Sequence, residues 1–203
     1  MSGKIVVISG PSGCGKSSLI SEILKQEADI YFSISTTTRE IREGEREGVN
    51  YHYISKAQFE REIEEGAFLE WAEVHGNYYG TSLKPIYRAI EAGKLVILDI
   101  DVQGHAIVRE KFPRILTSVF LTTPTKAELQ RRLEHRGTDS EAVIATRLEN
   151  ALTEMERMDE YEYLLVNDDF ETALAQLHCI IHAARLKPSR QEIGAFIRNW
   201  QKI

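Results

Sequence analysis

The chain has 203 residues, a length that fits one domain or a core domain with modest insertions. Hydrophobic residues make up 42% of it and charged residues 28%, and no apolar run approaches the roughly 18 residues that span a bilayer. The net charge of −6 argues against nucleic-acid binding as its main role. Two cysteines make no disulfide framework, and the N-terminus has no signal-peptide pattern. We therefore expect a cytoplasmic protein with no membrane or nucleic-acid partner.

Apolar runs and helical patterns alternate along the chain. Buried strands are expected at residues 4–9, 95–100, 119–121 and 163–166. Helices are expected at residues 16–26, 83–92, 125–136, 140–158 and 170–185, and after Ser189. Between residues 31 and 79 the apolar signal is short and alternating, with one helix between Ser55 and Gly66. This order predicts an α/β fold with a parallel sheet flanked by helices and a small mixed insertion.

One motif carries most of the functional information. The segment GPSGCGKS, Gly10 to Ser17, matches G-x-x-x-x-G-K-[ST] in full, follows an expected buried strand and opens an expected helix. Its glycines let backbone N–H groups point at phosphate oxygens, and the helix N-terminus adds a partial positive charge. Lys16 supplies a charge to the β- and γ-phosphates of ATP, and Ser17 supplies a hydroxyl to Mg²⁺. The predicted ATP-binding residues here are Gly10, Pro11, Ser12, Gly13, Cys14, Gly15, Lys16, Ser17 and Ser18.

A second candidate for metal binding is Asp99, which ends the apolar run LVILD. Parallel sheets place ligands at the carboxyl ends of their strands, and a carboxylate at this place helps to hold Mg²⁺, directly or through water. We therefore expect Ser17 and Asp99 to share the metal site.

Five further segments narrow the substrate. They are STTTREIREGE from Ser35, NY from Asn50, FLEW from Phe68, GNYYGT from Gly76 and LDIDVQG from Leu98. Together with the P-loop they closely resemble guanylate kinases, in order and spacing, over essentially the whole chain. One departure is Ile41, which stands where the family usually has a proline between two arginines. That change removes no ligand group.

The resemblance implies a Mg²⁺-dependent enzyme of purine nucleotide metabolism that converts ATP and GMP to ADP and GDP. It implies a P-loop core at residues 1–30, 82–124 and 159–203, a GMP-binding region at 31–81 and a mobile lid at 125–158. The implied GMP phosphate grip is Arg39, Arg42, Tyr51 and Tyr79, and the implied guanine contacts are Ser35, Glu70, Thr81 and Asp101. The implied lid and phosphate-clamping arginines are Arg132, Arg136 and Arg147, and Asn167 falls near the adenine of ATP. Lys16, Arg39, Arg42, Arg136 and Arg147 are the expected catalytic residues.

The chemistry of these residues suits guanine. An arginine fork can hold a phosphate bidentately. A carboxylate such as Glu70 can accept from both N1–H and N2–H₂ of guanine, while hydroxyls such as Ser35 and Thr81 can donate to O6. Adenine would leave Glu70 buried and unpaired. GMP is therefore the expected acceptor, with dGMP as an alternative that carries the same base.

Two other functions remain open from the sequence. One is a kinase on the same scaffold that phosphorylates a ribose bisphosphate, and the other is a non-catalytic guanylate-kinase-like binding module. A monomer and a homo-oligomer are both compatible with the sequence. His178 and His182 stand at i, i+4, a spacing that can bind zinc, although no third ligand is evident in the sequence. Phe196 and Trp200 on the last helix are expected to dock that helix.

Overall fold

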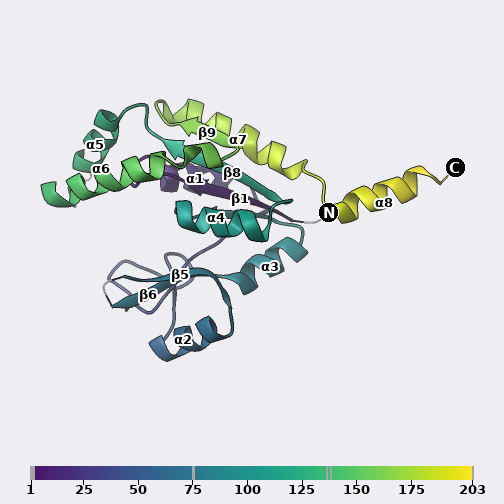
Figure 1. Ribbon diagram of the computed structural model, residues 1–203, viewed down its shortest axis with the longest axis horizontal. Helices are drawn as coiled ribbons and strands as arrows, with labels where there is room; N and C mark the ends of the chain where they lie inside the picture. Colours follow the sequence, from purple (N-terminus) through teal and green to yellow (C-terminus); the bar gives the residue numbers. More distant parts are fainter. Residues whose placement is uncertain (1–2, 75, 136, 138, 203) are drawn as a thin grey trace.

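The computed structural model describes residues 3–74, 76–135, 137 and 139–202. A parallel sheet forms the centre of the molecule, and a smaller sheet with one helix lies to one side of it (Figure 1). In this described part, no helix is both long enough and apolar enough to cross a membrane.

The central sheet has five strands in the order β2-β7-β1-β8-β9, all parallel to their neighbours. The strands are β1 (Lys4–Ser9), β2 (Ile30–Phe32), β7 (Leu95–Asp99), β8 (Leu116–Thr122) and β9 (Tyr163–Val166). Every residue of β1 is buried, because the strand lies between two neighbours and is covered by helices on both faces. The continuous apolar sequence of β1 follows from this position.

Helices cover the two faces of the sheet unequally. On one face, α1 (Lys16–Gln26), α5 (Lys126–His135), α6 (Glu141–Met155) and α7 (Phe170–Arg185) share a core with Val6 and Ile8. On the other face, α3 (Leu83–Glu91) and α4 (Val102–Lys111) share a core with Ile5 and Val7. Successive residues of β1 therefore point to opposite cores, as the period of a strand requires.

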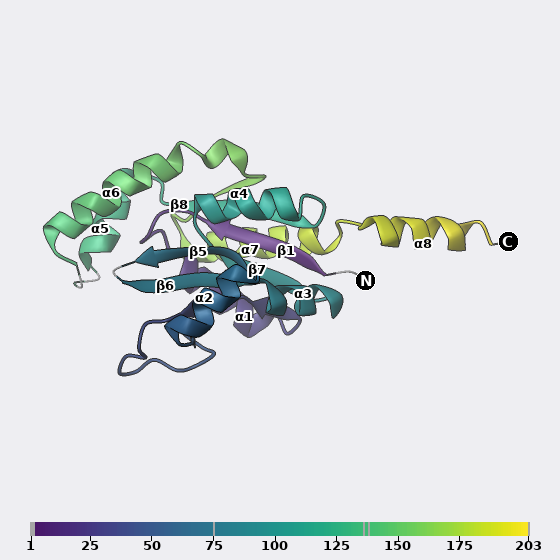
Figure 2. The ribbon, with the colours of Figure 1, turned by 60° about the horizontal axis from the view of Figure 1, so that its bottom comes forward.

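The second sheet has four strands in the order β4-β3-β6-β5. They are β3 (Thr36–Thr37), β4 (His52–Tyr53), β5 (Phe68–Val74) and β6 (Asn77–Ser82), and α2 (Lys56–Glu64) packs beside them. Phe59 of α2 stacks on Phe68 with ring centroids 4.2 Å apart. Leu69 of β5 belongs to the core that α3 and α4 share with Ile5 and Val7. The small sheet is therefore fixed to the face of the parallel sheet that these two helices cover (Figure 2).

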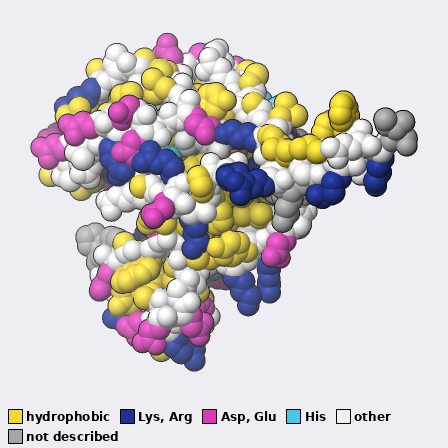
Figure 3. Space-filling view, turned by 45° about the vertical axis from the view of Figure 1, so that its right-hand side comes forward, with side chains coloured by type: hydrophobic (Ala, Val, Ile, Leu, Met, Phe, Trp, Pro, Cys, Tyr) yellow, Lys and Arg dark blue, Asp and Glu magenta, His cyan; other side chains and the backbone are white. Residues whose placement is uncertain are grey.

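The last helix, α8 (Arg190–Trp200), extends away from the body of the molecule (Figure 1). Ser189 and Glu192 form its capping box, and Lys4 pairs with Glu192 at 3.0 Å. Phe196 is 69% exposed and Trp200 is 77% exposed, and hydrophobic side chains are visible along the projecting segment (Figure 3). The expectation that these two residues dock the helix is therefore wrong within this chain.

The expected α/β fold is confirmed, with differences at short elements. The chain leaves the parallel sheet after Phe32 rather than at residue 30, because β2 pairs with β7. Strand β8 begins three residues before the expected 119, and α6 ends at Met155 rather than 158. Between α6 and β9 lies one turn of 3-10 helix, η1 (Met158–Glu160). Helix α4 was not predicted, since its residues show no apolar stripe of helical period.

His105 of α4 is a buried histidine whose ring lies 3.9 Å from that of Tyr161, centroid to centroid. Burial, with repulsion from Arg109, lowers the pKa of His105 to about 4. In the unfolded chain this histidine takes up a proton near pH 6.5. The unfolded state therefore binds more protons between these two values, and the native state loses stability as the pH falls through that interval.

We expect the free energy of unfolding to decrease by up to roughly 3 kcal/mol between pH 6.5 and 4 through this residue. Urea unfolding of the full chain at several pH values measures this loss. His105→Phe, which keeps a ring against Tyr161, should flatten the pH dependence, whereas the exposed control His135→Gln should not. An unchanged slope in His105→Phe would show that another group causes the acid sensitivity.

Candidate active site

The P-loop connects β1 to α1, and its backbone leaves no room for larger residues at two glycines. Gly10 has φ of 140°, and a Cβ there would lie 1.9 Å from the carbonyl oxygen of Leu121. Gly15 has φ of 103°, and a Cβ there would lie 2.3 Å from Nδ2 of Asn167. Both positions combine a left-handed conformation with a close approach of another element, which glycine alone tolerates. The loop therefore holds its shape at the N-terminus of α1.

Lys16, the first residue of α1, folds back over the P-loop. Its ammonium group donates to the carbonyl oxygens of Gly10 at 2.6 Å and Pro11 at 3.2 Å. It faces a cleft of about 330 Å³. The lining residues of that cleft are Gly10, Ser12, Gly13, Gly15, Lys16, Ser17, Asp99, Ile100, Asp101 and Glu154. The cleft thus joins phosphate-binding backbone, one cation and three carboxylates.

Burial controls the charge of two of these carboxylates. Removal from water raises the pKa of Asp99 at the end of β7, and the Lys16 ammonium opposes the rise. Burial also raises the pKa of Glu154 on α6, again against the effect of Lys16. Oxygen ligands grouped in this way are suited to a hard divalent cation. Sequence reasoning missed Glu154, because it is one of several acidic residues on a polar helix.

Residues of the expected lid reach the P-loop directly. Arg147 of α6 donates to Ser12 Oγ at 2.5 Å, and its guanidinium also lies 3.4 Å from Asp139. Arg132 of α5 donates to the Asn167 carbonyl at 2.8 Å and pairs with Glu128 at 2.6 Å. Two arginines far along the chain from the P-loop thus lie against it, and both are positioned by a carboxylate.

Asn167 is buried below the loop. Its side-chain amide donates to the Cys14 carbonyl at 2.8 Å, and its own backbone N–H donates to Thr122 at 2.8 Å. Arg132 also reaches the Cys14 carbonyl, at 3.4 Å. These bonds tie β8 and the residue after β9 to the P-loop, so Asn167 supports the shape of the loop from behind.

A second cluster surrounds Arg39 in the loop after β3. Nη2 of Arg39 donates to both carboxylate oxygens of Glu45, at 2.7 and 3.0 Å, and the guanidinium lies 5.6 Å from the centre of the Tyr51 ring. The ring of Tyr51 is 5.9 Å from that of Tyr79. Tyr53 donates to Glu45 at 2.8 Å. Three of the four expected phosphate-grip residues therefore lie together, with Glu45 holding the arginine in place.

Glu45 is a further member of this cluster, and the sequence did not single it out. The Arg39 guanidinium holds the pKa of its carboxyl near 2, with a further contribution from the backbone N–H of Arg42. The side chain of Arg42 itself is exposed on this loop. Ser35 is half-buried before β3, and its carbonyl accepts from His52 at 2.9 Å. Arg136, the remaining expected catalytic residue, lies outside the described residues.

Two of the four expected guanine contacts, Glu70 and Thr81, meet on the small sheet. Thr81 of β6 is buried and donates to Glu70 Oε1 of β5 at 2.5 Å. Burial raises the pKa of Glu70, and the nearby negative charge of Asp101 adds to the rise. Asp101 caps α4 by accepting from Gln103 at 3.0 Å and Gly104 at 2.8 Å, and it also lines the cleft. Asp101 therefore lies at the P-loop cleft and also within electrostatic range of Glu70.

A P-loop that follows the first strand of a parallel sheet and opens a helix defines a P-loop nucleotide-binding fold. The guanylate kinase family model matches residues 2–184. The chain belongs to the guanylate kinase family and is an enzyme of that family.

Comparisons with individual proteins support this family assignment. The chain is 53% identical to a guanylate kinase of Sulfurimonas denitrificans over 201 residues, covering 99% of this chain and 98% of that protein. It is 44% identical to a guanylate kinase of Campylobacter jejuni over 203 residues, covering 100% of this chain and 99% of that protein. The crystal structure of a guanylate kinase from Anaplasma phagocytophilum superposes with a TM-score of 0.70 at 31% identity, covering 92% of this chain and 88% of that one.

Proposed function

We propose that this enzyme transfers the γ-phosphoryl group of ATP to GMP and releases ADP and GDP. The observation that carries the proposal is the position of Asp101, which lines the P-loop cleft and acts electrostatically on the Glu70–Thr81 pair. A nucleoside triphosphate on the P-loop and the base of the acceptor at Glu70 would thus face each other across one cleft. Purine nucleotide metabolism in the cytoplasm is the setting that we expect for this reaction.

Recognition of guanine rests on Glu70. Because Thr81 donates to Oε1, the second carboxylate oxygen is available for the N1–H and N2–H₂ donors of the base. In this arrangement Thr81 orients Glu70, and because its single hydroxyl hydrogen goes to that carboxylate, it cannot at the same time donate to O6 as we expected from the sequence. A bound guanine would also stabilise the charged carboxylate, whose pKa is raised by burial in its absence.

The acceptor phosphate is assigned to the Arg39 cluster. Glu45 already holds one edge of the Arg39 guanidinium, and Tyr51 and Tyr79 stand beside it. An arginine held in this way loses little side-chain freedom when a phosphate binds. Arg42, on the same loop, would add a second cation when the loop closes on GMP, and the half-buried Ser35 remains a proposed base contact.

The residues of the cleft fit Mg²⁺, since this ion prefers oxygen ligands and the site offers the Ser17 hydroxyl, Asp99 and Glu154. Burial raises the pKa of both carboxylates against the opposing effect of Lys16, and a bound cation would favour their charged forms. Ser17 and Asp99 would hold the ion, which when bound neutralises charge on the ATP phosphates.

The chain's own cations supply the remaining stabilisation. We propose that Lys16 leaves the carbonyls of Gly10 and Pro11 for the β- and γ-phosphates, and that Arg147 turns from Ser12 to the transferring group. Arg132 is assigned to the same clamp, and Arg136 is retained as a catalytic residue from the sequence pattern. The division into a core, a GMP-binding region at 31–81 and a lid at 125–158 also stays a prediction.

The alternative functions fit the site less well. A ribose bisphosphate would place phosphate charge against the half-buried Glu70 and the nearby Asp101, which repel it. A non-catalytic binding module does not require the Lys16 ammonium at a cleft lined by three carboxylates. Phosphoryl transfer to a guanine nucleotide accounts for both halves of the site.

An acceptor panel tests the proposal. The purified full chain is assayed with ATP, Mg²⁺ and GMP, dGMP, AMP, UMP, CMP or ribose bisphosphate in turn, with ADP formation as the readout. We expect GMP to exceed AMP by at least about a thousandfold in kcat/KM, because adenine leaves the Glu70 carboxylate unpaired. Equal use of AMP, or preference for ribose bisphosphate, would overturn the acceptor assignment.

A further inference from the structure

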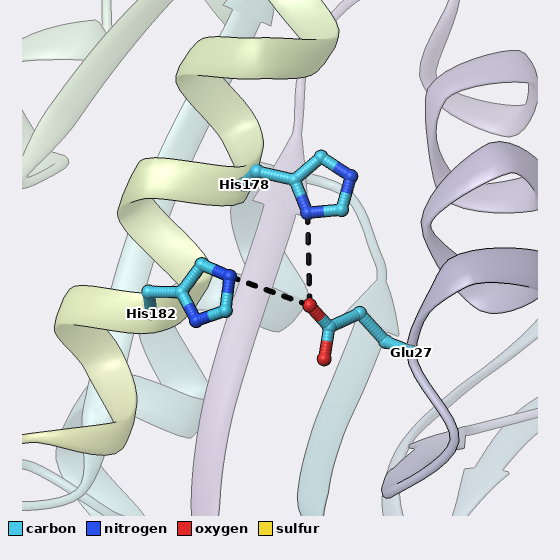
Figure 4. A group of neighbouring side chains, drawn as sticks. All are labelled: Glu27, His178 and His182. Atoms are coloured by element: carbon cyan, nitrogen blue, oxygen red, sulfur yellow. Dashed lines mark ion pairs between the residues drawn. The ribbon is translucent and has the colours of Figure 1, made fainter.

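Two histidines and a carboxylate meet on the face of the molecule where α7 packs on α1. His178 and His182 lie one helical turn apart on α7, and Glu27 caps the C-terminus of α1 (Figure 4). Nδ1 of His178 lies 3.7 Å from Glu27 Oε1, and Nε2 of His182 lies 3.4 Å from the same oxygen. One ligand atom from each of the three residues lies within 4.8 Å of the others.

The packing of the two helices fixes this arrangement. Ile23 of α1 and Leu177 and Ile181 of α7 belong to one buried core. The backbone N–H of Glu27 still bonds to the Ile23 carbonyl at 3.0 Å, so the carboxylate stands on the last turn of α1. The three side chains are therefore carried by rigid elements rather than by loops, as a site of defined geometry needs.

Neighbouring residues set the tautomer of His178. Its Nε2 lies 2.8 Å from Gln26 Oε1, and the Gln26 amide nitrogen donates to Glu22 at 3.0 Å, which fixes the amide orientation. A carbonyl oxygen can only accept, so Nε2 of His178 carries the proton. In the neutral ring, Nδ1 then presents a lone pair to a carboxylate oxygen.

Two acceptors that face each other need a proton or a metal cation between them. Arg185 donates to the other carboxylate oxygen, Oε2, at 3.2 Å and so turns Oε1 towards the imidazoles. A histidine whose remote nitrogen is tied to an amide or carboxylate, beside a carboxylate held by a second residue, is the arrangement that orients ligands around a metal. The Gln26 and Arg185 contacts supply both parts of it.

We propose that Glu27, His178 and His182 form a binding site for a divalent transition-metal ion of the zinc class. Two ligands at about 2.1 Å from a tetrahedral ion lie about 3.4 Å apart, close to the 3.4 and 3.7 Å seen between the imidazoles and Glu27. Two imidazoles select zinc, nickel or copper over Mg²⁺, which prefers oxygen. The site therefore differs in metal class from the P-loop cleft.

Exposure allows the ion to enter. The side chains of Glu27 and His178 are 17% and 22% exposed, whereas that of His182 is 64% exposed. His182 can thus adjust its rotamer to complete the site, and water takes the fourth position. The ion would join the C-terminus of α1 to α7, about 16 Å along α1 from the P-loop. We therefore expect it to stabilise the fold without entering the reaction.

Zinc binding by the full chain tests the site, in the absence of nucleotides because these chelate zinc. After treatment with EDTA and desalting, the chain is titrated with Zn²⁺ alone in competition with a chromogenic chelator. We expect one equivalent to bind, and His182→Ala and His178→Ala each to weaken binding by at least about tenfold. Thermal unfolding is the second readout: Zn²⁺ should raise the Tm of the unchanged chain and not that of His182→Ala.

Two matched controls separate this site from other ligands. Cys179→Ser changes an exposed thiol next to His178 that faces a different groove, with Tyr163 and Leu164, and His135→Ala removes an exposed histidine on α5. Both should bind zinc as the unchanged chain does. If the unchanged chain binds no zinc, or if both α7 variants bind it equally well, the residues only form an ion pair and the proposal is wrong.

Discussion

Replacing Lys16 by alanine is expected to reduce kcat by about a hundredfold or more while the fold persists. The ammonium lies on the P-loop carbonyls of Gly10 and Pro11, at the cleft where the ATP phosphates are placed. Loss of about 3 kcal/mol of charge stabilisation in the transition state corresponds to this factor. Steady-state kinetics with saturating ATP and GMP measures the loss, and circular dichroism checks the fold.

Lys25→Ala is the matched control for this change. Lys25 stands on the same helix and pairs with Glu22 at 2.9 Å on the surface, and such exposed pairs contribute little to stability. Its kcat should stay within about twofold of the unchanged enzyme. Turnover by folded Lys16→Ala close to that of Lys25→Ala would mean that the P-loop cation does not act on the phosphates.

Glu70→Gln is expected to lower kcat/KM for GMP by roughly ten- to several-hundredfold, with little effect on ATP binding. If the new amide oxygen keeps the bond from Thr81, the amide nitrogen faces the base and places a donor against the N1–H and N2–H₂ donors. A charge-assisted hydrogen bond contributes about 1.5–3 kcal/mol, and the buried mismatch adds a penalty of similar size.

The comparison uses GMP and IMP, which lacks the 2-amino group, together with ATP affinity. Glu73→Gln changes an exposed carboxylate on the same strand and serves as the matched control. Unreduced GMP efficiency in Glu70→Gln, or equal use of IMP and GMP by the unchanged enzyme, would show that Glu70 does not contact guanine.

Elements with strong local signals could be predicted from the sequence. Strand β1 and helix α1 begin and end where expected, because a buried central strand needs an unbroken apolar run and a P-loop opens a helix. Strands β2, β3 and β4 have three, two and two residues. Such strands are too short for a periodic pattern and form only because β7, β6 and β3 respectively offer partners. The strand order likewise follows from long-range packing.

The candidate site likewise combines residues with local sequence signals and residues that only long-range packing brings together. The P-loop residues are contiguous, and the residues around Arg39 and Glu70 follow a family pattern. Glu154 and Glu45 were missed, because each is one acidic residue among several on a polar segment, and only the fold brings them to Lys16 and Arg39. Glu27 is likewise separated from His178 by 151 positions in the sequence, so the third ligand of the proposed metal site appears only when α1 and α7 pack together.

The reaction itself tests the central proposal most directly. The purified chain is incubated with ATP, GMP and Mg²⁺, and all four nucleotides and inorganic phosphate are quantified by ion-exchange chromatography and a phosphate assay. We expect ADP and GDP to form in equal amounts, with no release of inorganic phosphate above background and no ADP when GMP is omitted. Formation of ADP and phosphate at a rate independent of GMP would contradict transfer to GMP.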